Sequence, residues 1–521
     1  MAFDLVLSGG LVLDGTGSEA RRADVGIEGD RITAVDDLAG AEAATTIDVT
    51  GRTITPGLVD THTHTDGVPF LEDDNEVIKV ASLRQGVTTE VCGNCGFSPF
   101  PCLPEHEASL RGFFAEPFRA LADYRTAVDA RGSAVNLAPL IGAGYLRGGT
   151  MGFENRAPSA DEMATMEHEL GRALDEGAFG LSSGLIYPPG MFARTEELIA
   201  LAAVMARTGR PYTTHMRNEA DGVLDSIEEA LRIGREGGVP VHISHHKLAG
   251  RPNWGRSTET LARLEQARAD GYDVTIDVYP YTASSTTLLA TLPAWVNDGG
   301  PTAVLERLSD AATRAEVIEQ LERERGQGEE DLVHGSGWDG IVVASARGVS
   351  SVEGKSINDV AVERGCRPAE AACDLIVESQ AGVMVVLHSM SPVDVAAIRA
   401  WPLAMIGSDG LPFPGRQHPR VAGTFAKVLG EAARGGTLAD AVHRNTAMAT
   451  ERFGIVDRGV VRPGAIADLV VLDPATVSDR ATYDDPWATP VGIDDVFVAG
   501  QHAVRDGEPT GVRAGAMLSP R

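Results

Sequence analysis

The sequence has few of the features that mark secreted, disulfide-bonded or membrane proteins. It holds only five cysteines in 521 residues, too few and too unevenly spaced for a disulfide framework. No apolar run approaches the roughly 18–20 residues that span a bilayer. Near the start, Asp4 lies where a secretory signal would carry positive charge. We therefore expect a cytoplasmic protein that is not bound to a membrane.

Positive charge is also in short supply. Lysine and arginine total 45 against 74 aspartates and glutamates, a formal net charge of −29. This excess disfavours binding to nucleic acid or to an anionic membrane, and its simplest consequence is solubility. Apolar residues make up 43% and charged residues 23% of the chain, as in ordinary globular proteins. We expect a small-molecule partner, and the composition leaves the oligomeric state open.

The two ends of the chain are rich in short β patterns. Residues 1–56 contain β-rich runs separated by glycine or aspartate turns, which is typical of a small antiparallel unit. Residues 464–474 and 496–507 have the same character. We predict that segments 1–56 and 455–521 pair into one small β-sandwich domain.

Between these ends, short apolar strands alternate with helical stretches such as 226–238, whose apolar residues are spaced three and four apart. This alternation predicts an α/β fold, a (β/α)₈ TIM-like barrel over residues 57–454, with its chemistry at the carboxyl ends of the strands. A doubly wound open sheet is the alternative, but no G-x-G-x-x-G follows an early strand. The predicted barrel strands are 57–62, 87–91, 134–140, 179–183, 211–215, 239–245, 273–278 and 403–407.

One segment is too long for a single barrel unit. Residues 279–402 separate the seventh and eighth predicted strands, so we expect an insertion within about 286–380. Its patterns predict helices near 302–325 and 368–380, and an extra strand at 383–387.

Histidines follow the first predicted strand. His62 and His64 are two residues apart, and alternate residues of a strand face the same way, so both rings can reach one ion. Neutral imidazole is a common zinc ligand. A lone H-x-H also arises by chance, but this one stands directly after an apolar strand.

Further candidate ligands fall where other strands should end: His215, then His245 and His246, and finally Asp409. A single histidine at a strand end is more often a hydrogen-bonded core residue than a ligand. Several separate strand ends with such residues are harder to explain as packing, and they favour a metal centre at one barrel mouth.

Cys95 adds a soft anionic ligand just past the second strand. A thiolate near two cations is deprotonated and could bridge them. Cys92 and Cys95 could instead form a redox pair or half of a zinc knuckle. No second C-x-x-C exists and a thioredoxin-like context is missing, so both alternatives are weaker. Cys92 lies within the strand and is expected to pack.

At this point the motifs GNCG, GLSSGLIYPPG, HMRNE, ISHHK, DVYPYTASST, IGSDGLP and HPRVAGTF can be read together. From about residue 5 to 510, the chain resembles the N-acyl-D-amino-acid deacylases (D-aminoacylases) of the amidohydrolase superfamily. Hydantoinases and dihydroorotases in that superfamily use a carboxylated lysine as bridging ligand. Here FGLSSG stands at the fourth strand, which favours the branch with a bridging cysteine.

The resemblance implies a zinc enzyme. One zinc would be held tightly by Cys95, His215 and His245. A second, weaker site would use His62, His64 and Asp409, and could share Cys95. Of the adjacent histidines, the resemblance selects His245, and strand alternation leaves His246 as a supporting or packing residue.

The resemblance also implies catalytic and binding roles. Asp409 would take a proton from water and pass it to the departing amine, although Ser-Asp-Gly also suits a plain turn. Tyr187 would hydrogen-bond the carbonyl oxygen; the alternative is a structural tyrosine beside two prolines. The substrate carboxylate would be bound by Lys247, Tyr279, Ser285 and Arg420. Lysine and arginine, however, are usually solvated surface residues.

The expected reaction is hydrolysis of N-acyl-D-amino acids to a carboxylate and a free D-amino acid. Handedness comes only from the resemblance. After Ser285 no basic residue occurs until Arg307, which favours neutral or hydrophobic side chains. The alternatives within the superfamily are an N-acyl-D-glutamate or N-acyl-D-aspartate deacylase, a D-dipeptidase and a cyclic-amide hydrolase. Outside it, a noncatalytic metal-binding barrel and a redox protein using Cys92 and Cys95 stay open.

Overall fold

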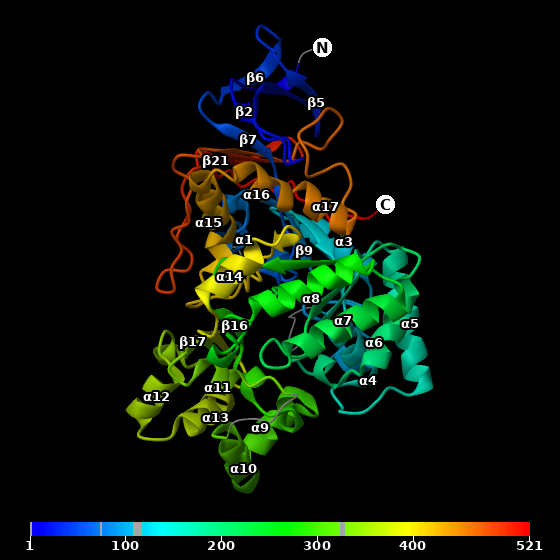
Figure 1. The fold of residues 1–521 in the computed structure, drawn as a ribbon, viewed down its shortest axis with the longest axis vertical. Coiled ribbons are helices and arrows are strands. Elements are labelled where there is room, and N and C mark those ends of the chain that lie inside the picture. Colours follow the sequence, from blue (N-terminus) through cyan, green and yellow to red (C-terminus); the bar gives the residue numbers. More distant parts are fainter. Residues whose placement is uncertain (1–2, 73–74, 108–116, 324–328, 521) are drawn as a thin grey trace.

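The chain folds into three regions along its long axis (Figure 1). A computed structural model describes residues 3–72, 75–107, 117–323 and 329–520. Strands from both chain ends lie at the top, the barrel fills the middle, and an inserted helical region lies at the bottom. The division into domains at particular residues remains an interpretation.

All eight predicted barrel strands are confirmed, and each observed strand overlaps its predicted range. The strands pair in parallel in chain order, and β11 continues β10 after a break at Leu140. They are β8 (Leu58–Asp60), β9 (Val87–Cys92), β10 (Asn136–Pro139), β11 (Ile141–Gly142), β12 (Leu181–Gly184), β13 (Tyr212–His215), β14 (Val241–Ile243), β15 (Val274–Val278) and β19 (Ala404–Ile406).

Backbone hydrogen bonds close the barrel between its first and last strands. The Asp409 amide donates to the His62 carbonyl at 2.8 Å, and Thr63 forms a parallel bridge with Gly410. The fold class is therefore a closed (β/α)₈ barrel with a β-sandwich domain, as the sequence predicted. The open doubly wound sheet is excluded because its first and last strands would not pair.

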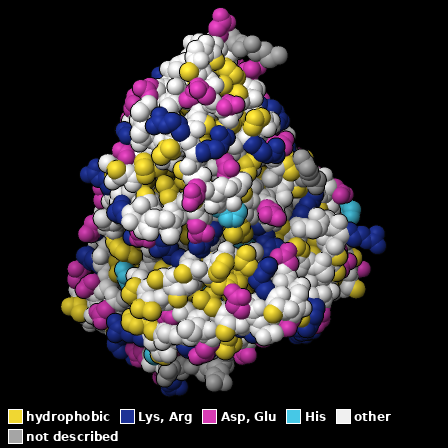
Figure 2. Space-filling view, turned by 45° about the horizontal axis from the view of Figure 1, so that its top comes forward, with side chains coloured by type: hydrophobic (Ala, Val, Ile, Leu, Met, Phe, Trp, Pro, Cys, Tyr) yellow, Lys and Arg dark blue, Asp and Glu magenta, His cyan; other side chains and the backbone are white. Residues whose placement is uncertain are grey.

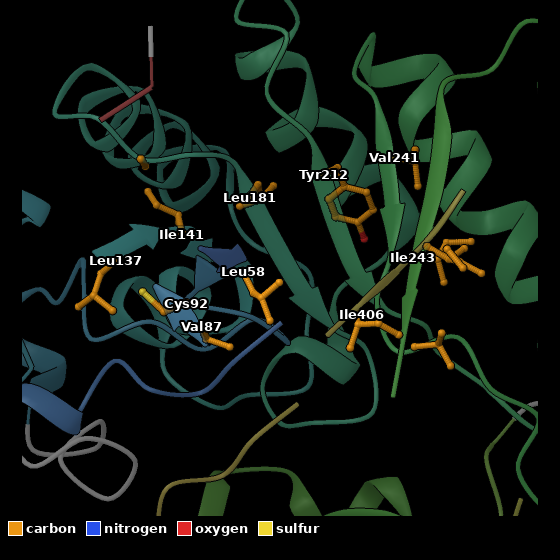
Figure 3. Packing of buried hydrophobic residues seen from close by; sticks show 14 of the residues in the cluster. Leu58, Val87, Cys92, Leu137, Ile141, Leu181, Tyr212, Val241, Ile243 and Ile406 are labelled. Atoms are coloured by element: carbon orange, nitrogen blue, oxygen red, sulfur yellow. The ribbon is translucent and has the colours of Figure 1, made fainter. Parts of the chain in front are cut away.

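Alternate residues of the barrel strands pack into two separate cores. Leu58, Val87 and Leu137 pack outward against the helices, with further residues labelled in Figure 3. Their neighbours Val59 and Ala138 belong to a second buried cluster on the opposite face of the strands. Both faces of the strands are buried, as is usual for parallel sheets, and polar residues such as Thr88, Thr89 and Glu90 of β9 are buried among the apolar ones.

The helices cover the outside of the barrel, and α7 shows why the sequence forms them. Ile227, Ala230, Leu231 and Gly234 recur on one buried face, and Gly238 ends the helix with φ +70°. The helix predicted over 226–238 is confirmed. The helices outside the insertion are α1 (Glu76–Lys79), α3 (Leu121–Arg131), α4 (Ala143–Met151), α5 (Ala160–Asp175), α6 (Thr195–Met205), α7 (Val223–Gly237), α8 (Ser257–Ala269), α14 (Pro392–Arg399), α15 (Arg420–Gly435), α16 (Leu438–Arg444) and α17 (Ala447–Phe453).

No helix in the described part of the chain combines the length and apolar character that crossing a bilayer requires. On the face drawn in Figure 2, acidic and basic side chains are interspersed. The excess of negative charge is thus spread among basic residues on this face and does not form one acidic region there.

The small domain joins the two chain ends through the antiparallel pair β7–β20. One difference from the expectation is that β1 pairs with β6, and β2 with β7, in parallel, because intervening strands carry the chain back before each pair forms. The strands are β1 (Phe3–Ser8), β2 (Leu11–Val12), β3 (Arg21–Arg22), β4 (Asp24–Glu28), β5 (Arg31–Asp36), β6 (Ala43–Asp48), β7 (Thr53–Pro56), β20 (Leu469–Leu472), β21 (Ile493–Val498), β22 (Gln501–Arg505) and β23 (Glu508–Pro509).

The last residues leave the small domain and return to the barrel. The Leu137 amide of β10 donates to the Ala516 carbonyl, and the Leu518 amide donates back to Leu137. Asn136 accepts a further hydrogen bond from the Ala516 amide. The C-terminal segment therefore binds the barrel strand directly, although the sequence assigned all of 455–521 to the small domain.

The expected insertion has a core of its own. Its helices near 302–321 and 368–378 and its strand at 383–387 agree with the prediction. Its antiparallel sheet β16–β18–β17 begins at Ser284 and ends at Leu387, slightly beyond the expected limits, because β16 and β18 pair at its base. Its elements are β16 (Ser284–Thr287), α9 (Gly300–Ser309), α10 (Ala311–Leu321), α11 (Leu332–Ser336), β17 (Ile341–Ala346), α12 (Ile357–Arg364), α13 (Pro368–Glu378) and β18 (Val383–Leu387).

An ion pair with a buried carboxylate lies where the small domain meets the barrel, and it yields a stability prediction. Arg458 Nε lies 2.8 Å from Asp468 Oδ2, which also accepts from Asn136 of β10. Arg458→Met leaves this buried carboxylate without its cation, so we expect a loss of about 3 kcal/mol and a lower melting temperature by calorimetry. Arg462→Met, at an exposed position, is the control and should change little.

The loss in Arg458→Met should depend on pH with a definite sign. Burial already raises the pKa of Asp468, and Arg458 opposes that rise. Without Arg458 the folded-state pKa rises further. The deficit relative to the wild-type protein is therefore smallest in acid, grows as the pH rises from the wild-type folded-state pKa to the higher pKa of the variant, and is constant above it. An equal deficit at acidic and neutral pH would contradict this account.

Candidate active site

The six predicted metal ligands meet at the carboxyl ends of the barrel strands. They lie at or just past the ends of β8, β9, β13, β14 and β19, which are distant in sequence but belong to one barrel of parallel strands. The groups that can surround a cation include His62 with Cys95 and His245, and His62 with His64 and Asp409. The structure thus brings together all six predicted metal ligands, whereas His246, the further candidate, points elsewhere.

Cys95 lies at the centre of this cluster. Its Sγ atom lies 3.3 Å from His62 Nε2, 3.5 Å from His245 Nε2 and 3.8 Å from His215 Nδ1. A tetrahedral zinc with ordinary Zn–S and Zn–N bonds separates sulfur and nitrogen by about 3.5 Å. These separations therefore fit a zinc ion between the thiolate and the imidazoles.

A second group lies beside the first. His64 Nε2 is 3.1 Å and His62 Nε2 is 3.6 Å from Asp409 Oδ1, while Arg420 Nη1 lies 2.9 Å from Asp409 Oδ2. His62 contacts both Cys95 and Asp409, so it belongs to both groups of candidate ligands. This arrangement suits a second cation next to the first.

The protonation states also fit metal ligands. Burial lowers the pKa of His215 and of His245 well below the usual value, which leaves neutral imidazoles with a lone pair. Burial and then the nearby Asp409 carboxylate raise the pKa of the Cys95 thiol. A thiolate at this position therefore needs a cation close by, which a zinc ion would supply.

The backbone is strained at three of the candidate ligands. Cys95, His245 and Asp409 all have positive φ, at 52°, 34° and 52°. Residues other than glycine adopt this region at an energetic cost, and the surrounding structure must hold them there. Such strain at three converging side chains favours a functional constraint over ordinary packing.

Small residues on β12 allow the Cys95 loop to come close. A Cβ atom on Gly184 would lie 2.1 Å from the Cys95 carbonyl oxygen, so only glycine fits there. The Gly96 amide donates to Ser182 Oγ at 3.0 Å. The LSSG sequence thus supports the cysteine loop at the position where related enzymes were expected to carry a lysine.

Two acidic residues that the sequence analysis did not single out contact the histidines. Glu219 Oε1 lies 3.1 Å from His245 Nδ1, and Asp277 Oδ2 lies 2.8 Å from His242 Nε2. Asp277 also accepts from the His245 amide at 2.6 Å. Burial opposes ionisation of Asp277, but His62 and His242 outweigh it and lower its pKa. Two sequence signals were present: both residues lie at or just past strand ends, and they belong to the motifs HMRNE and DVYPYTASST.

Tyr187 lies next to the candidate zinc ligands. Its ring packs against the His215 ring with centroids 5.1 Å apart, and its hydroxyl accepts from Thr286 Oγ1 at 3.1 Å. Burial raises the pKa of Tyr187, so the phenol keeps its proton and can donate a hydrogen bond. Thr286 belongs to β16, so the insertion contributes to the position of this hydroxyl.

The four predicted carboxylate-binding residues also cluster. The Tyr279 ring lies 4.9 Å from the Arg420 guanidinium carbon and 5.9 Å from Lys247 Nζ, and Arg420 Nη2 donates to the Ser285 carbonyl. Within the described residues, the buried Tyr279 hydroxyl and Ser285 Oγ have no hydrogen-bond partner. Two cations and two unpaired hydroxyls suit an anionic ligand.

His246 and Cys92, which lie close in sequence to candidate ligands, point away from the candidate metal site, as predicted. His246 Nε2 bonds Thr260 Oγ1 of α8 at 3.0 Å, and Cys92 packs in the apolar core labelled in Figure 3. Cys92 and Cys95 are both free thiols. With Cys92 in the core and Cys95 in the histidine cluster, the pair does not have the arrangement of a redox disulfide.

Comparison with known proteins agrees with this geometry. The family model described as "Amidohydrolase family" matches residues 45–504. A D-aminoacylase from Alcaligenes xylosoxydans xylosoxydans is 37% identical over 529 residues, covering 99% of this chain and 98% of the relative. The chain belongs to the amidohydrolase family. Within that family, the amidohydrolase belongs to the D-aminoacylase group.

Two further relatives show how closely the group is related. An N-acyl-D-glutamate deacylase from the same organism is 38% identical to this amidohydrolase over 521 residues, covering 99% of this chain and 96% of the relative. The crystal structure of an N-acyl-D-glutamate deacylase from Bordetella bronchiseptica, complexed with zinc and a phosphonate inhibitor, is 36% identical and covers both chains fully, with a TM-score of 0.83. As an amidohydrolase, this protein is a hydrolase of amide bonds.

The central position of Cys95 leads to a metal-binding prediction. Cys95→Ala removes the sulfur that three imidazoles face, so we expect loss of tightly bound zinc when the purified amidohydrolase is dialysed and its metal measured by plasma mass spectrometry. Cys92→Ala is the matched control, because that thiol packs in the apolar core, and should retain zinc at the wild-type level. Full zinc content in Cys95→Ala would remove Cys95 from the metal site.

Proposed function

We propose that this amidohydrolase is a zinc-dependent N-acyl-D-amino-acid deacylase that releases a carboxylate and a free D-amino acid. The observation that carries the proposal is the placement of Cys95 Sγ within 3.3–3.8 Å of three imidazoles at the barrel mouth. Relatives with D-aminoacylase and N-acyl-D-glutamate deacylase activity match almost the whole chain. A noncatalytic barrel is disfavoured because two candidate catalytic residues lie beside the candidate ligands. They are the base Asp409 and Tyr187, which would donate a hydrogen bond to the substrate carbonyl.

Cys95, His215 and His245 would hold a tightly bound zinc, and His62, His64 and Asp409 a weaker one. When bound, zinc lowers the pKa of a coordinated water and polarises the scissile carbonyl. Since Cys95 also contacts His62, the thiolate could serve both positions.

Asp409 and Tyr187 would carry the proton and the developing charge. Burial opposes ionisation of Asp409, but Arg420 and His64 outweigh it and lower its pKa well below the usual value, so the carboxylate is available to accept a proton from water. It would then pass this proton to the departing amine. Tyr187, whose phenol stays protonated, would donate to the carbonyl oxygen as negative charge develops.

Lys247, Tyr279, Ser285 and Arg420 would bind the α-carboxylate of the substrate. Support comes from the unpaired hydroxyls of Tyr279 and Ser285 beside two buried cations. A bound carboxylate would give these buried groups hydrogen-bond partners, and an arginine can bind it through two parallel bonds. Anchoring this end places the amide bond toward the metal ligands.

For the side chain we propose neutral or hydrophobic D-amino acids. Residues 286–306 carry no lysine or arginine. Leu288, Leu289 and Leu292 of this stretch pack in the core of the insertion, so their apolar character serves folding. The stretch bears on selectivity only because it carries no cation. Identities of 37% and 38% to deacylases of different specificity do not discriminate between them.

A stereochemical panel tests the proposed reaction. We expect hydrolysis of N-acetyl-D-leucine with a higher kcat/KM than N-acetyl-D-glutamate or N-acetyl-D-aspartate, no turnover of the L-isomers, and loss of activity after treatment with a chelator. Hydantoins and dihydroorotate serve as cyclic controls. A preference for D-glutamate would overturn the proposed side-chain selectivity, and turnover of cyclic amides alone would favour the cyclic-amide alternative.

The role of Asp409 can be separated from metal binding. Asp409→Asn keeps the size of the side chain but cannot accept a proton, so kcat should fall by about 100-fold or more while the zinc held by Cys95, His215 and His245 is largely retained. Asp394→Asn is the control, because this buried aspartate caps residues 255–257 away from the ligands. Near-normal kcat in Asp409→Asn would refute the assignment.

A further inference from the structure

Glu219 is buried between the two histidines proposed to bind zinc most tightly. Its side chain is 3% exposed. One carboxylate oxygen, Oε1, lies 3.1 Å from His245 Nδ1, and the other, Oε2, lies 3.4 Å from His215 Nε2 and 2.6 Å from Lys247 Nζ. A single carboxylate thus contacts two candidate metal ligands and one candidate substrate-binding residue.

We propose that Glu219 is a positioning residue that fixes which nitrogen of His215 and of His245 carries the proton, and that it holds Lys247 in place for the substrate. The proposal rests on the zinc deacylase function proposed above. Glu219 would act through these three side chains, without touching the substrate.

The two histidines present opposite nitrogens to Glu219 and to Cys95. His245 faces Glu219 with Nδ1 and Cys95 with Nε2, and His215 faces Glu219 with Nε2 and Cys95 with Nδ1. A neutral imidazole has one N–H and one lone pair, and a carboxylate only accepts. Donation to Glu219 Oε1 places the His245 proton on Nδ1 and leaves the Nε2 lone pair directed toward the metal position. His215 Nε2 has no hydrogen-bond partner among the described residues. Glu219 Oε2, 3.4 Å away, would accept its proton, which directs the Nδ1 lone pair of His215 toward the metal position.

The same carboxylate determines where Lys247 binds. Lys247 Nζ lies 2.6 Å from both Glu219 Oε2 and His245 Nδ1. An ammonium group only donates, so it cannot bond a protonated Nδ1. When His245 binds the metal through Nε2, its Nδ1 carries the proton and cannot accept from Lys247. The Glu219 carboxylate is then the acceptor that remains for Lys247.

The surrounding backbone fixes Glu219 from several directions. It lies four residues after His215, in a turn where Asn218 Oδ1 accepts from the Ala220 and Gly222 amides. The Glu219 amide donates to Glu330 Oε2 of the insertion at 3.1 Å, and its carbonyl accepts from Ala249. A carboxylate held this firmly can orient its neighbours.

A different role for Glu219 is direct metal binding, because His215, Glu219 and His245 also lie close enough to hold an ion. That site would use the histidine nitrogens that face away from Cys95. It would leave out the thiol that three imidazoles surround. The positioning role uses both sets of contacts at once, and the experiment distinguishes the two roles.

Glu219→Gln tests the proposal with the full-length, zinc-loaded protein. A glutamine keeps one acceptor oxygen but presents an amide donor where the second oxygen was, so at least one contact is lost. We expect zinc affinity, measured by competition with a chelator in the absence of substrate, to fall about 10- to 100-fold. KM for an N-acyl-D-amino acid should rise through Lys247, and X-ray absorption at saturating zinc should show unchanged sulfur and nitrogen neighbours.

Glu197→Gln is the matched control, because Glu197 is also buried in an ion pair, with Arg147, away from the metal ligands. It should lower the melting temperature and leave zinc affinity unchanged. Wild-type zinc affinity and KM in Glu219→Gln would overturn the positioning role. Loss of an oxygen neighbour from zinc in Glu219→Gln would overturn it in favour of direct binding.

The outcome can be separated from that of the proposed function. Zinc affinity is measured without substrate, so an effect of Glu219→Gln on metal binding stands even if the wild-type protein hydrolyses no N-acyl-D-amino acid. If the wild-type protein does hydrolyse them and Glu219→Gln binds zinc normally with an unchanged KM, only the role of Glu219 fails.

Discussion

The convergence of imidazoles on the Cys95 thiol is the interaction on which the rest of the site depends. Burial and nearby carboxylates raise the pKa of this thiol, while burial keeps His215 and His245 neutral. A buried thiolate among acidic groups is costly unless a cation accompanies it. The protein therefore provides a set of groups whose charges balance when a divalent metal is present.

The scaffold holds these groups at a conformational cost. Cys95, His245 and Asp409 adopt left-handed backbone conformations, and the close approach of the Cys95 loop to β12 requires Gly184. The barrel tolerates such strain because its closed sheet and two buried cores fix the strand ends from which the ligands project. The insertion adds contacts from outside the barrel, through Thr286 to Tyr187 and through Glu330 to the Glu219 backbone.

Several features could be predicted because they depend on local pattern. Apolar strands of parallel sheets, the helix at α7 and the strand at β18 each have a characteristic composition and period. The candidate ligands His62, His64, His215 and Asp409 could be nominated because strand ends of one barrel meet at one face. Handedness of the substrate has no counterpart in spacing and came only from resemblance to D-aminoacylases.

By itself, the sequence determined the barrel and its insertion, because these follow from periodicity. It also nominated the six candidate ligands and the family, through residues at strand ends and through motifs that resemble those of the D-aminoacylases. Only the tertiary structure decided that Glu219 and Asp277 contact the histidines, that the leucines after Ser285 pack within the insertion, and that residues 515–518 return to β10. These facts depend on contacts between segments distant in sequence, and local pattern carries no information about which side chains will meet across such distances.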